Sequence, residues 1–240
     1  MTFSNYRMTS HDYIFRKTKS GIKFIGDFES FYLNENDPWE QSASKNEGKN
    51  NEMANFYEIS RHKLTDFLGL HINDNDSICE CGCGTGYVTE SLLMKFPNQE
   101  ISGCDISKTA IEKASQNFQN IGFFQHDILS SPLPQKYNVL ILSNILWYVI
   151  HDFENLIVNS LNSLNRERES LLVVQNALFK SGQKYFQDIV NSIGTMSDLF
   201  TDRLLKVASI GFDFEINTKF IRRDEMNHDF GILLIKIPKI

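Results

Sequence analysis

Short apolar runs alternate with helical patterns along the chain from residue 76 onward. An apolar run bounded by polar residues is typical of a strand, whereas apolar residues three and four apart are typical of one helix face. Strands are predicted at Ser77–Cys81, Glu100–Cys104, Gly122–Gln125, Tyr137–Leu142, Ser170–Gln175, Phe212–Phe220 and Gly231–Ile237. Helices are predicted at Thr85–Phe96, Ser107–Phe118, Phe153–Leu164 and Gln183–Ile193, with Ser107 and Asp152 as N-caps.

This alternation indicates an α/β fold with a mostly parallel sheet that is covered by helices on both faces. The run Tyr137–Leu142 is apolar throughout its second half, which is typical of a strand buried on both sides. No helical pattern separates the last two strands. We therefore predict seven strands, of which the C-terminal two form an antiparallel hairpin at one edge.

Residues 1–75 have a different pattern. An aromatic cluster is followed by the polar stretch Asn34–Glu52, whose composition predicts a mobile loop. Apolar residues then recur at helical spacing over Ala54–Leu68. We predict that residues 1–75 form a helical lid segment of the same domain, and that residues 76–240 form the core. The aromatic cluster consists of Phe24, Phe28, Phe31 and Tyr32.

Composition excludes several partners. The formal net charge is −6, and the basic pairs Arg166/Arg168 and Arg222/Arg223 stand beside acidic residues. Nucleic-acid binding normally depends on a basic surface, so no nucleic acid is expected as a partner. The longest apolar stretch, Val139–Ile150, is too short for a membrane span. The first residues lack the apolar centre of a secretory signal, and a cytoplasmic location is expected.

The chain has four cysteines, Cys79, Cys81, Cys83 and Cys104. Cys-x-Cys-x-Cys is not a usual zinc spacing, and no histidine follows at finger distance. On a strand, residues 79, 81 and 83 would face one side, because side chains alternate. We predict reduced, packed thiols and no metal site.

Three glycines, Gly82, Gly84 and Gly86, stand where a predicted strand gives way to a helix. They allow a sharp bend and the close approach of a ligand to the backbone. A dinucleotide fingerprint would need Gly or Ala at Tyr87 or Thr89, and no Gly-Lys-Ser/Thr follows, so the segment matches neither that fingerprint nor a phosphate loop. An ordinary turn is the alternative interpretation.

Polar residues close the next strands on the same side of the sheet. Asp105 ends the second strand, His126-Asp127-Ile128 the third, and Ser143-Asn144 the fourth. Ligands of open α/β sheets bind at these carboxyl ends. A carboxylate at position 105 is suited to accept hydrogen bonds from both ribose hydroxyls of an adenosine, and Asp127 one from an adenine amino group.

Together these residues resemble the class I S-adenosylmethionine-dependent methyltransferases. Their motif Glu/Asp-x-Gly-x-Gly-x-Gly is matched by Glu80-Cys-Gly-Cys-Gly-Thr-Gly86, and the resemblance covers about Ser77 to Gln175. It implies a Rossmann-like fold, the methyl donor S-adenosyl-L-methionine and the product S-adenosyl-L-homocysteine.

The resemblance also implies roles for single residues. Asp105 would hold the ribose and Ile106 would flank the adenine. Asp127 and Ile128 would contact the adenine, with His126 beside them. Asn144 would lie near the sulfonium, next to Ser143. The loop residues that would pack against the methionine and ribose part of the donor are Glu80, Cys81, Gly82, Cys83, Gly84 and Gly86.

A second resemblance lies ahead of the core. Asp37-Pro-Trp39, Phe56-Tyr-Glu58 and Arg61 are similar to segments of the nodulation-type N-methyltransferases and of surface-polysaccharide methyltransferases. It implies that Arg61 pairs with the methionine carboxylate, as a forked guanidinium can. A solvated helix charge is the alternative for Arg61.

The acceptor is less defined. The fourth strand ends in Ser143-Asn-Ile-Leu146, without the Asn/Asp-Pro-Pro-Tyr/Phe motif of base methylation. His151 is the candidate general base, and an exposed helix-capping histidine is the alternative. Aromatic faces suit a sugar ring or the core equally, and the candidates for the acceptor wall are Trp39, Tyr57, Trp147 and Tyr148.

The predicted function is methyl transfer to an oxygen or nitrogen of a small molecule, preferably a sugar, glycan or surface-polysaccharide precursor. The alternatives are a non-catalytic partner subunit that binds the donor and a methyltransferase of another metabolite, such as a phosphorylated intermediate. Tyr87 disfavours a nicotinamide dehydrogenase. The sequence does not predict an oligomeric state.

Overall fold

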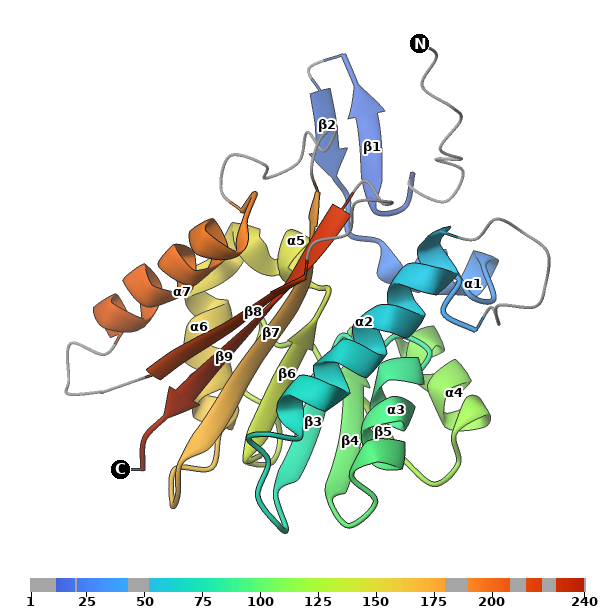
Figure 1. Cartoon of the computed structure of the whole chain (residues 1–240). Helices are drawn as coiled ribbons and strands as arrows, with labels where there is room; N and C mark the ends of the chain where they lie inside the picture. The colour runs from blue at the N-terminus through green and yellow to red at the C-terminus, as the bar shows by residue number, and fades with distance from the viewer. Residues whose placement is uncertain are drawn as a thin grey trace.

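A seven-stranded sheet with helices on both faces forms the centre of the molecule (Figure 1). The structure is a computed structural model that describes residues 12–19, 21–42, 52–179, 190–207, 215–221 and 228–239. The strands, in order across the sheet, are β5 (Gly122–Gln125), β4 (Glu100–Asp105), β3 (Ser77–Cys81), β6 (Val139–Ser143), β7 (Ser170–Phe179), β9 (His228–Ile237) and β8 (Glu215–Ile221). β9 runs antiparallel to β7 and to β8, and the other neighbours are parallel. The predicted fold class is confirmed.

The helices lie in two layers. α2 and α3 cover one face of the sheet, and α6 and α7 cover the other (Figure 1). The helices are α1 (Phe28–Asn34), α2 (Glu52–Leu68), α3 (Tyr87–Lys95), α4 (Lys108–Asn117), α5 (Leu146–Val149), the 3-10 turn η1 (Ile150–Asp152), α6 (Phe153–Ser163) and α7 (Ile193–Val207). Strand side chains alternate between the layers, so that Ile78 packs toward α2 and α3 while Cys79 packs toward the other face.

The predicted caps have different outcomes. The Ser107 hydroxyl accepts a hydrogen bond from the Ala110 backbone N–H at 3.1 Å, which confirms it as the N-cap of α4. Asp152 precedes α6, but its side chain makes no capping bond to the backbone. The Asp152 carboxylate instead accepts a hydrogen bond from the Asn155 side-chain amide at 2.9 Å. Asp152 is therefore the N-cap residue of α6, as predicted, but it caps the helix by position and not through its side chain.

α7 is a helix that the sequence pattern did not predict. Of the predicted helix Gln183–Ile193, residues 183–189 lie outside the described residues, and α7 begins at Ile193. Its buried residues Met196, Phe200 and Leu204 recur every four positions, and the Phe200 ring meets the Phe153 ring of α6 edge-on at 4.9 Å. The helical period is therefore present after Ile193, where no helix was predicted.

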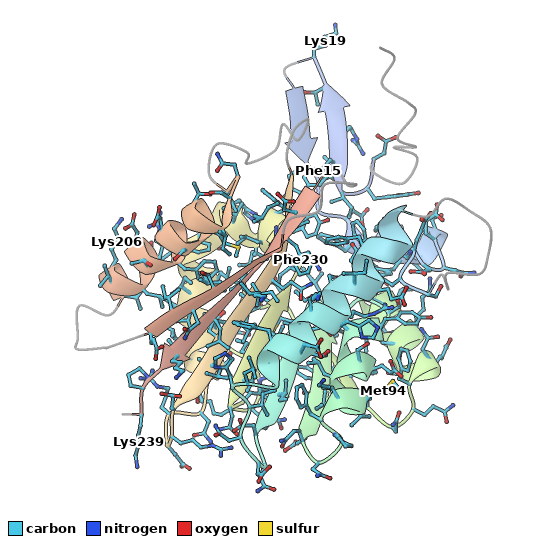
Figure 2. The ribbon with its side chains drawn as sticks, in the orientation of Figure 1. Phe15, Lys19, Met94, Lys206, Phe230 and Lys239 are labelled. Atoms are coloured by element: carbon cyan, nitrogen blue, oxygen red, sulfur yellow. The ribbon has the colours of Figure 1, made fainter. Side chains whose placement is uncertain are left out.

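An antiparallel hairpin precedes α1, although helices alone are predicted for residues 1–75. It consists of β1 (Phe15–Thr18) and β2 (Gly21–Phe24). Figure 2 shows Lys19 at its tip, away from the sheet, and Phe15 at its base. Each strand has four residues, which is too short for a clear alternation of apolar and polar positions. Residues 43–51 of the predicted mobile loop lie outside the described residues.

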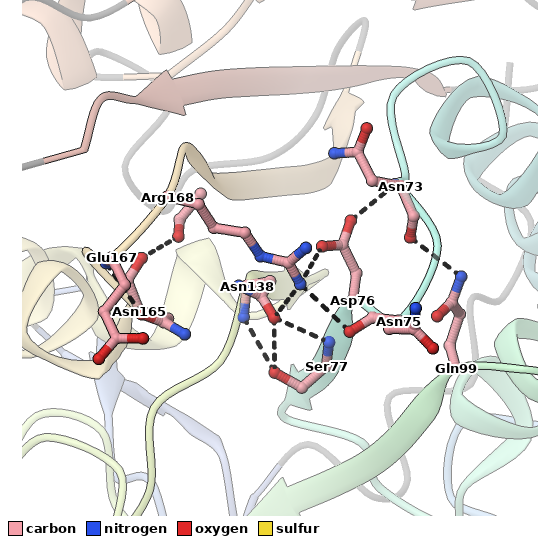
Figure 3. A network of polar contacts seen from close by, with 10 residues as sticks. Asn73, Asn75, Asp76, Ser77, Gln99, Asn138, Asn165, Glu167 and Arg168 are labelled. Carbon is pink, nitrogen blue, oxygen red and sulfur yellow. Dashed lines mark hydrogen bonds and ion pairs between the residues drawn. The ribbon is translucent and has the colours of Figure 1, made fainter.

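A polar network links the residues that precede β3, β6 and β7 (Figure 3). It lies at the amino ends of these strands, whereas the glycine loop follows the carboxyl end of β3. An Arg168 guanidinium nitrogen lies 2.7 Å from the buried Asp76 carboxylate and donates to the Asn138 side-chain oxygen, also at 2.7 Å. The Ser77 backbone N–H donates to the same oxygen at 3.1 Å. The network fixes these three strands relative to one another at their amino ends.

Among the described residues, no helix is long and apolar enough to cross a membrane.

Candidate active site

A cavity of about 290 Å³ opens at the carboxyl ends of β3, β4 and β6. The chain runs from β3 outward to β4 and β5, then returns to place β6 on the other side of β3. This reversal of strand order separates the loops that follow β3 and β6, and ligands of open α/β sheets bind in that gap. The fold therefore places the glycine loop, Asp105 and Asn144 around one hollow.

The glycine loop forms the floor of the cavity. Gly82 and Gly84 have φ angles of +76° and +53°, a region that side chains rarely adopt. A Cβ atom at position 82 would lie 2.1 Å from Ile145, and one at position 84 would lie 2.7 Å from the Tyr32 hydroxyl. The Cys104 carbonyl accepts the Gly82 N–H at 2.8 Å. The bend is thus held to the neighbouring strand, and Gly82 and Gly84 both line the cavity.

Asp105 ends β4 beside this loop, and its side chain is buried. One carboxylate oxygen accepts the Gly84 N–H at 3.0 Å, and the other accepts the Ser107 N–H at 2.9 Å. Burial raises the pKa of Asp105 to about 6, although both hydrogen bonds act in the opposite direction. Asp105 is therefore largely ionised at neutral pH, and it can accept further hydrogen bonds.

Glu80 lies on β3 and is also buried. The Thr89 hydroxyl donates to its carboxyl at 2.6 Å. Burial raises the pKa of Glu80 to about 8, with smaller contributions from the charges of Cys79 and Asp105. At pH 7 the group is mostly protonated, so it can donate one hydrogen bond as well as accept.

Most of the residues predicted to bind the donor line this cavity. Asp127 holds its loop through a hydrogen bond from the Leu129 N–H at 2.9 Å. Asn144 has a φ of +58°, an uncommon conformation for a residue other than glycine, and its side-chain oxygen accepts the Ala177 N–H at 3.2 Å. The predicted residues in the lining are Glu80, Cys81, Gly82, Gly84, Asp105, Ile106, His126, Asp127, Ile128, Ser143 and Asn144.

Three residues predicted to bind the donor do not line the cavity. Cys83 is buried in the turn beyond β3, so the expectation that it shares a strand face with Cys79 and Cys81 is wrong. Gly86 is the N-cap residue of α3. The Arg61 guanidinium lies 5.7 Å from the Tyr87 ring centroid and donates a hydrogen bond to the Gln41 carbonyl at 3.1 Å. Arg61 therefore stabilises the position of Gln41, which lines the cavity.

An aromatic cluster lines one part of the cavity. The Tyr148 ring lies 5.1 Å from Phe28, 6.3 Å from Phe24 and 6.1 Å from Trp39, measured between ring centroids. Burial raises the pKa of Tyr148, which stays a neutral phenol. Trp39, Tyr57 and Tyr148 of the predicted acceptor wall line the cavity. Trp147 does not, because it is buried in the core on the α6 side.

His151 also lines the cavity, at an exposed position. Its ring centroid lies 5.5 Å from that of Phe24. The histidine thus lies where η1 meets the N-terminal segment and has access to both solvent and the cavity. Its role as a general base stays a prediction.

The N-terminal segment contributes residues that sequence reasoning missed. Tyr32 of α1 lies over Gly84, and its hydroxyl accepts the Trp39 indole N–H at 3.0 Å. The Gln41 side-chain oxygen lines the cavity and is buried without a hydrogen-bond partner among the described residues. Phe24 and Phe28 stood out as an aromatic cluster, but a cluster alone does not distinguish a site from a core.

α1 is fixed to the core by one acid. The Glu29 carboxylate accepts hydrogen bonds from the Ser107 and Thr109 hydroxyls, both at 2.6 Å, at the start of α4. Although burial opposes ionisation, these bonds lower the pKa of Glu29. Ser107 also donates its backbone N–H to Asp105. Ser107 therefore connects α1, through Glu29, to the Asp105 carboxylate in the cavity.

Comparisons with known proteins identify the class. The fold resembles that of the N-methyltransferase NodS from Bradyrhizobium japonicum, solved with S-adenosyl-L-homocysteine, at a TM-score of 0.58 and 16% identity over 86% of this chain and 95% of that one. It also resembles magnesium protoporphyrin IX methyltransferase from Synechocystis, solved with the donor, at a TM-score of 0.60 and 16% identity, covering 86% and 92%. The fold is that of the class I S-adenosylmethionine-dependent methyltransferases, as the sequence resemblance implied.

The family follows from the sequence itself. A family model described as a methyltransferase domain matches residues 72–216, and the chain belongs to that family. Malonyl-[acyl-carrier protein] O-methyltransferase of Bacillus anthracis is 29% identical over 179 residues, which are 73% of this chain and 61% of that protein. The enzyme of the same name from Acetivibrio thermocellus is 37% identical over 105 residues, or 42% of this chain and 37% of that protein. The chain thus matches less than two thirds of these relatives.

Those relatives change the expected acceptor. Their names specify a malonyl group on an acyl carrier protein, and they do not support the predicted sugar or polysaccharide acceptor. The expected methyltransferase family is confirmed, whereas the acceptor needs a different interpretation.

Proposed function

We propose that this chain transfers a methyl group from S-adenosyl-L-methionine to the free carboxylate of a short acyl group carried by an acyl carrier protein. The observation that carries the proposal is the cavity floor. Gly82 and Gly84 line the cavity in a backbone conformation that side chains rarely adopt, and the buried Asp105 carboxylate accepts the Gly84 N–H beside them. This arrangement suits an adenosine sulfonium compound.

The donor residues follow from this arrangement. Asp105 accepts the ribose hydroxyls, Asp127 accepts the adenine amino group, and the exposed Ile106 flanks the base. The Gln41 side-chain oxygen has no hydrogen-bond partner among the described residues, and it is an acceptor for the ammonium group of the methionine end. An unsatisfied buried acceptor is costly, and a bound ammonium group would relieve that cost.

The acceptor class rests on the relatives and on simple chemistry. A carboxylate is already ionised at neutral pH, so its oxygen can attack the methyl carbon without a general base. The enzyme then mainly has to align oxygen, methyl carbon and sulfur. His151 would orient the acceptor in this scheme, and the cluster around Tyr148 would exclude water from the reacting atoms.

The N-terminal segment completes the proposal. We infer that residues 1–75 belong to the same domain as residues 76–240 and cover the donor. Glu29 and Tyr32 support this inference, because one holds α1 to α4 and the other lies over the glycine loop. The expected cytoplasmic location stays a prediction.

Mass spectrometry of the acceptor tests the function. The protein is incubated with donor and malonyl-acyl carrier protein, and the carrier is weighed intact. One methyl group should replace one acidic proton, and acetyl-acyl carrier protein, which lacks a free carboxylate, should stay unchanged. An unmodified malonyl carrier, in a sample that binds the donor by calorimetry, would overturn the acceptor and leave the donor site intact.

A further inference from the structure

Three of the four cysteines form a closed group directly beneath the cavity. The sulfur atoms of Cys79, Cys81 and Cys104 all lie within 4.8 Å of one another, and the side chains are buried. The Cys81 and Cys104 sulfurs are 3.4 Å apart, well beyond the ~2.05 Å of a disulfide bond. All four cysteines are free thiols. The group therefore offers three sulfur ligands at one point.

The parallel pairing of β3 with β4 creates this group. Cys81 lies opposite Cys104 in the register, and Cys79 lies opposite Ser102. Residues two apart on a strand share a face, so all three thiols point to the same side of the sheet. The spacing Cys-x-Cys-x-Cys suggested Cys83 as the third member, but the third thiol comes from the neighbouring strand. A sequence pattern within one strand could not reveal it.

Hydroxyl groups surround the innermost thiol. Side-chain hydrogen bonds link Cys79 to Cys104, Cys81, Ser102 and Tyr137. The Ser102 hydroxyl donates to the Tyr137 hydroxyl at 3.0 Å, and the Gln135 amide donates to it at 2.8 Å. Such outer hydrogen bonds orient metal-binding side chains and offset their negative charge.

We propose that Cys79, Cys81 and Cys104 form a trithiolate binding site for a soft metal ion, and that copper(I) is the ion it fits. Thiolates select copper(I), zinc and iron–sulfur clusters. Structural zinc sites almost always have four protein ligands, whereas the group found among the described residues has three. Metal–sulfur bonds of about 2.3 Å around one centre place the sulfurs about 4 Å apart, which lies within the observed spacing.

The site has an entry path and a balanced reaction. Cys81 and Cys104 line the cavity, so an ion can arrive through the open donor site. Each thiol that binds gives up its proton to solvent, three metal–sulfur bonds form, and the oxidation state of the ion does not change. The proposal does not rest on the proposed methyl transfer, but the ion and the donor would share this cavity.

Titration of the reduced full-length protein with copper(I), against a competing chromogenic chelator, tests the proposal. We expect one ion per chain and a near-ultraviolet thiolate–copper absorption. Cys79→Ser and Cys104→Ser should each lower the affinity at least tenfold, whereas the matched control Cys83→Ser should bind copper like the wild type. Circular dichroism checks that each variant is folded.

X-ray absorption on the copper-loaded wild type keeps the test independent of the variants, and it should give three sulfur neighbours. Two outcomes would overturn the proposal: Cys104→Ser binding copper as tightly as the wild type, or fewer than three sulfur neighbours. Zinc binding tighter than copper(I) in the same competition would overturn the choice of ion.

Discussion

The carboxylate of Asp105 accepts the backbone N–H of Gly84 at 3.0 Å, which joins the end of β4 to the bend that follows β3. The same side chain accepts the Ser107 N–H at the start of α4. One buried acid thus fixes two backbone segments beside the cavity. Its protonation state has consequences for binding.

Donor binding should weaken in acid. The pKa of Asp105 is raised to about 6, and bound ribose hydroxyls would favour the ionised form and lower that value. As the pH falls below 6, the affinity for S-adenosyl-L-homocysteine should fall by up to tenfold per pH unit, because a proton must leave before the ligand binds. Calorimetry between pH 5 and 8 measures this slope. The Asp105→Asn variant should bind S-adenosyl-L-homocysteine weakly, and its affinity should not depend on pH in this range. If its affinity fell with pH as steeply as that of the wild type, another group would be responsible for the titration.

Glu80 should make the fold less stable as the pH rises from about 4.5 to 8. The pKa of Glu80 is about 8 in the folded state, against 4.5 for an ordinary glutamate, so the folded protein binds more protons between these values. Stability therefore falls as the pH rises from about 4.5 to 8, by about 1.4 kcal/mol for each pKa unit at most.

Glu80→Gln should remove that loss, because the amide oxygen can still accept the Thr89 hydroxyl and does not ionise. Urea unfolding at pH 5 and pH 9 measures the difference. The exposed Glu112→Gln on α4 is the matched control and should behave like the wild type. A wild type whose stability is the same at both pH values would contradict the assigned shift.

Arg168 should stabilise the fold without affecting the site. Arg168→Met would leave the buried Asp76 carboxylate without its cation, at the end of the sheet opposite the cavity (Figure 3). Because Arg168 is 42% exposed, water would replace part of the interaction, and we expect a loss of about 1–3 kcal/mol in the free energy of unfolding. Donor affinity at 25 °C should be unchanged. A large loss of affinity in a folded variant would show that the two ends of the sheet are coupled.

His151 should be a positioning residue if the acceptor is a carboxylate. His151→Gln keeps a polar side chain beside Phe24 but cannot take up a proton. We expect kcat to fall less than tenfold, with KM for the acyl carrier raised and the pH profile unchanged between pH 6 and 8. Steady-state kinetics decide the point. A hundredfold fall in kcat with loss of the acidic limb would identify His151 as a general base and contradict the carboxylate acceptor.

The alternating strands and helices of the core could be predicted from the sequence. For example, β3 and β5 have the boundaries that the sequence pattern predicts. The strand β7 extends to Phe179, four residues beyond the predicted Gln175, since pairing with β9 carries it past the apolar run through the buried Asn176. Ladder partners from distant segments set that length, and a local pattern does not contain them.

The cavity residues likewise include some that the sequence predicts and some that it does not. Residues on the core motif, such as Asp105 and Asn144, were found because each strand end carries a recognisable polar residue. Tyr32 and Gln41 were missed, because their roles depend on how α1 and its following turn pack over the loop. Trp147 was misplaced, because helical phase in the short α5 decides which of two neighbouring aromatics faces the cavity.

Calorimetric titration with S-adenosyl-L-homocysteine tests the central claim most directly, because the product binds the donor site without reacting. The wild type should bind one molecule per chain, and Asp105→Ala should lose at least about 2 kcal/mol of binding free energy, since the ribose hydroxyls would lack their acceptor. The exposed Asp66→Asn on α2 is the control and should bind normally. An Asp105→Ala variant that is folded and binds as tightly as the wild type would contradict the account.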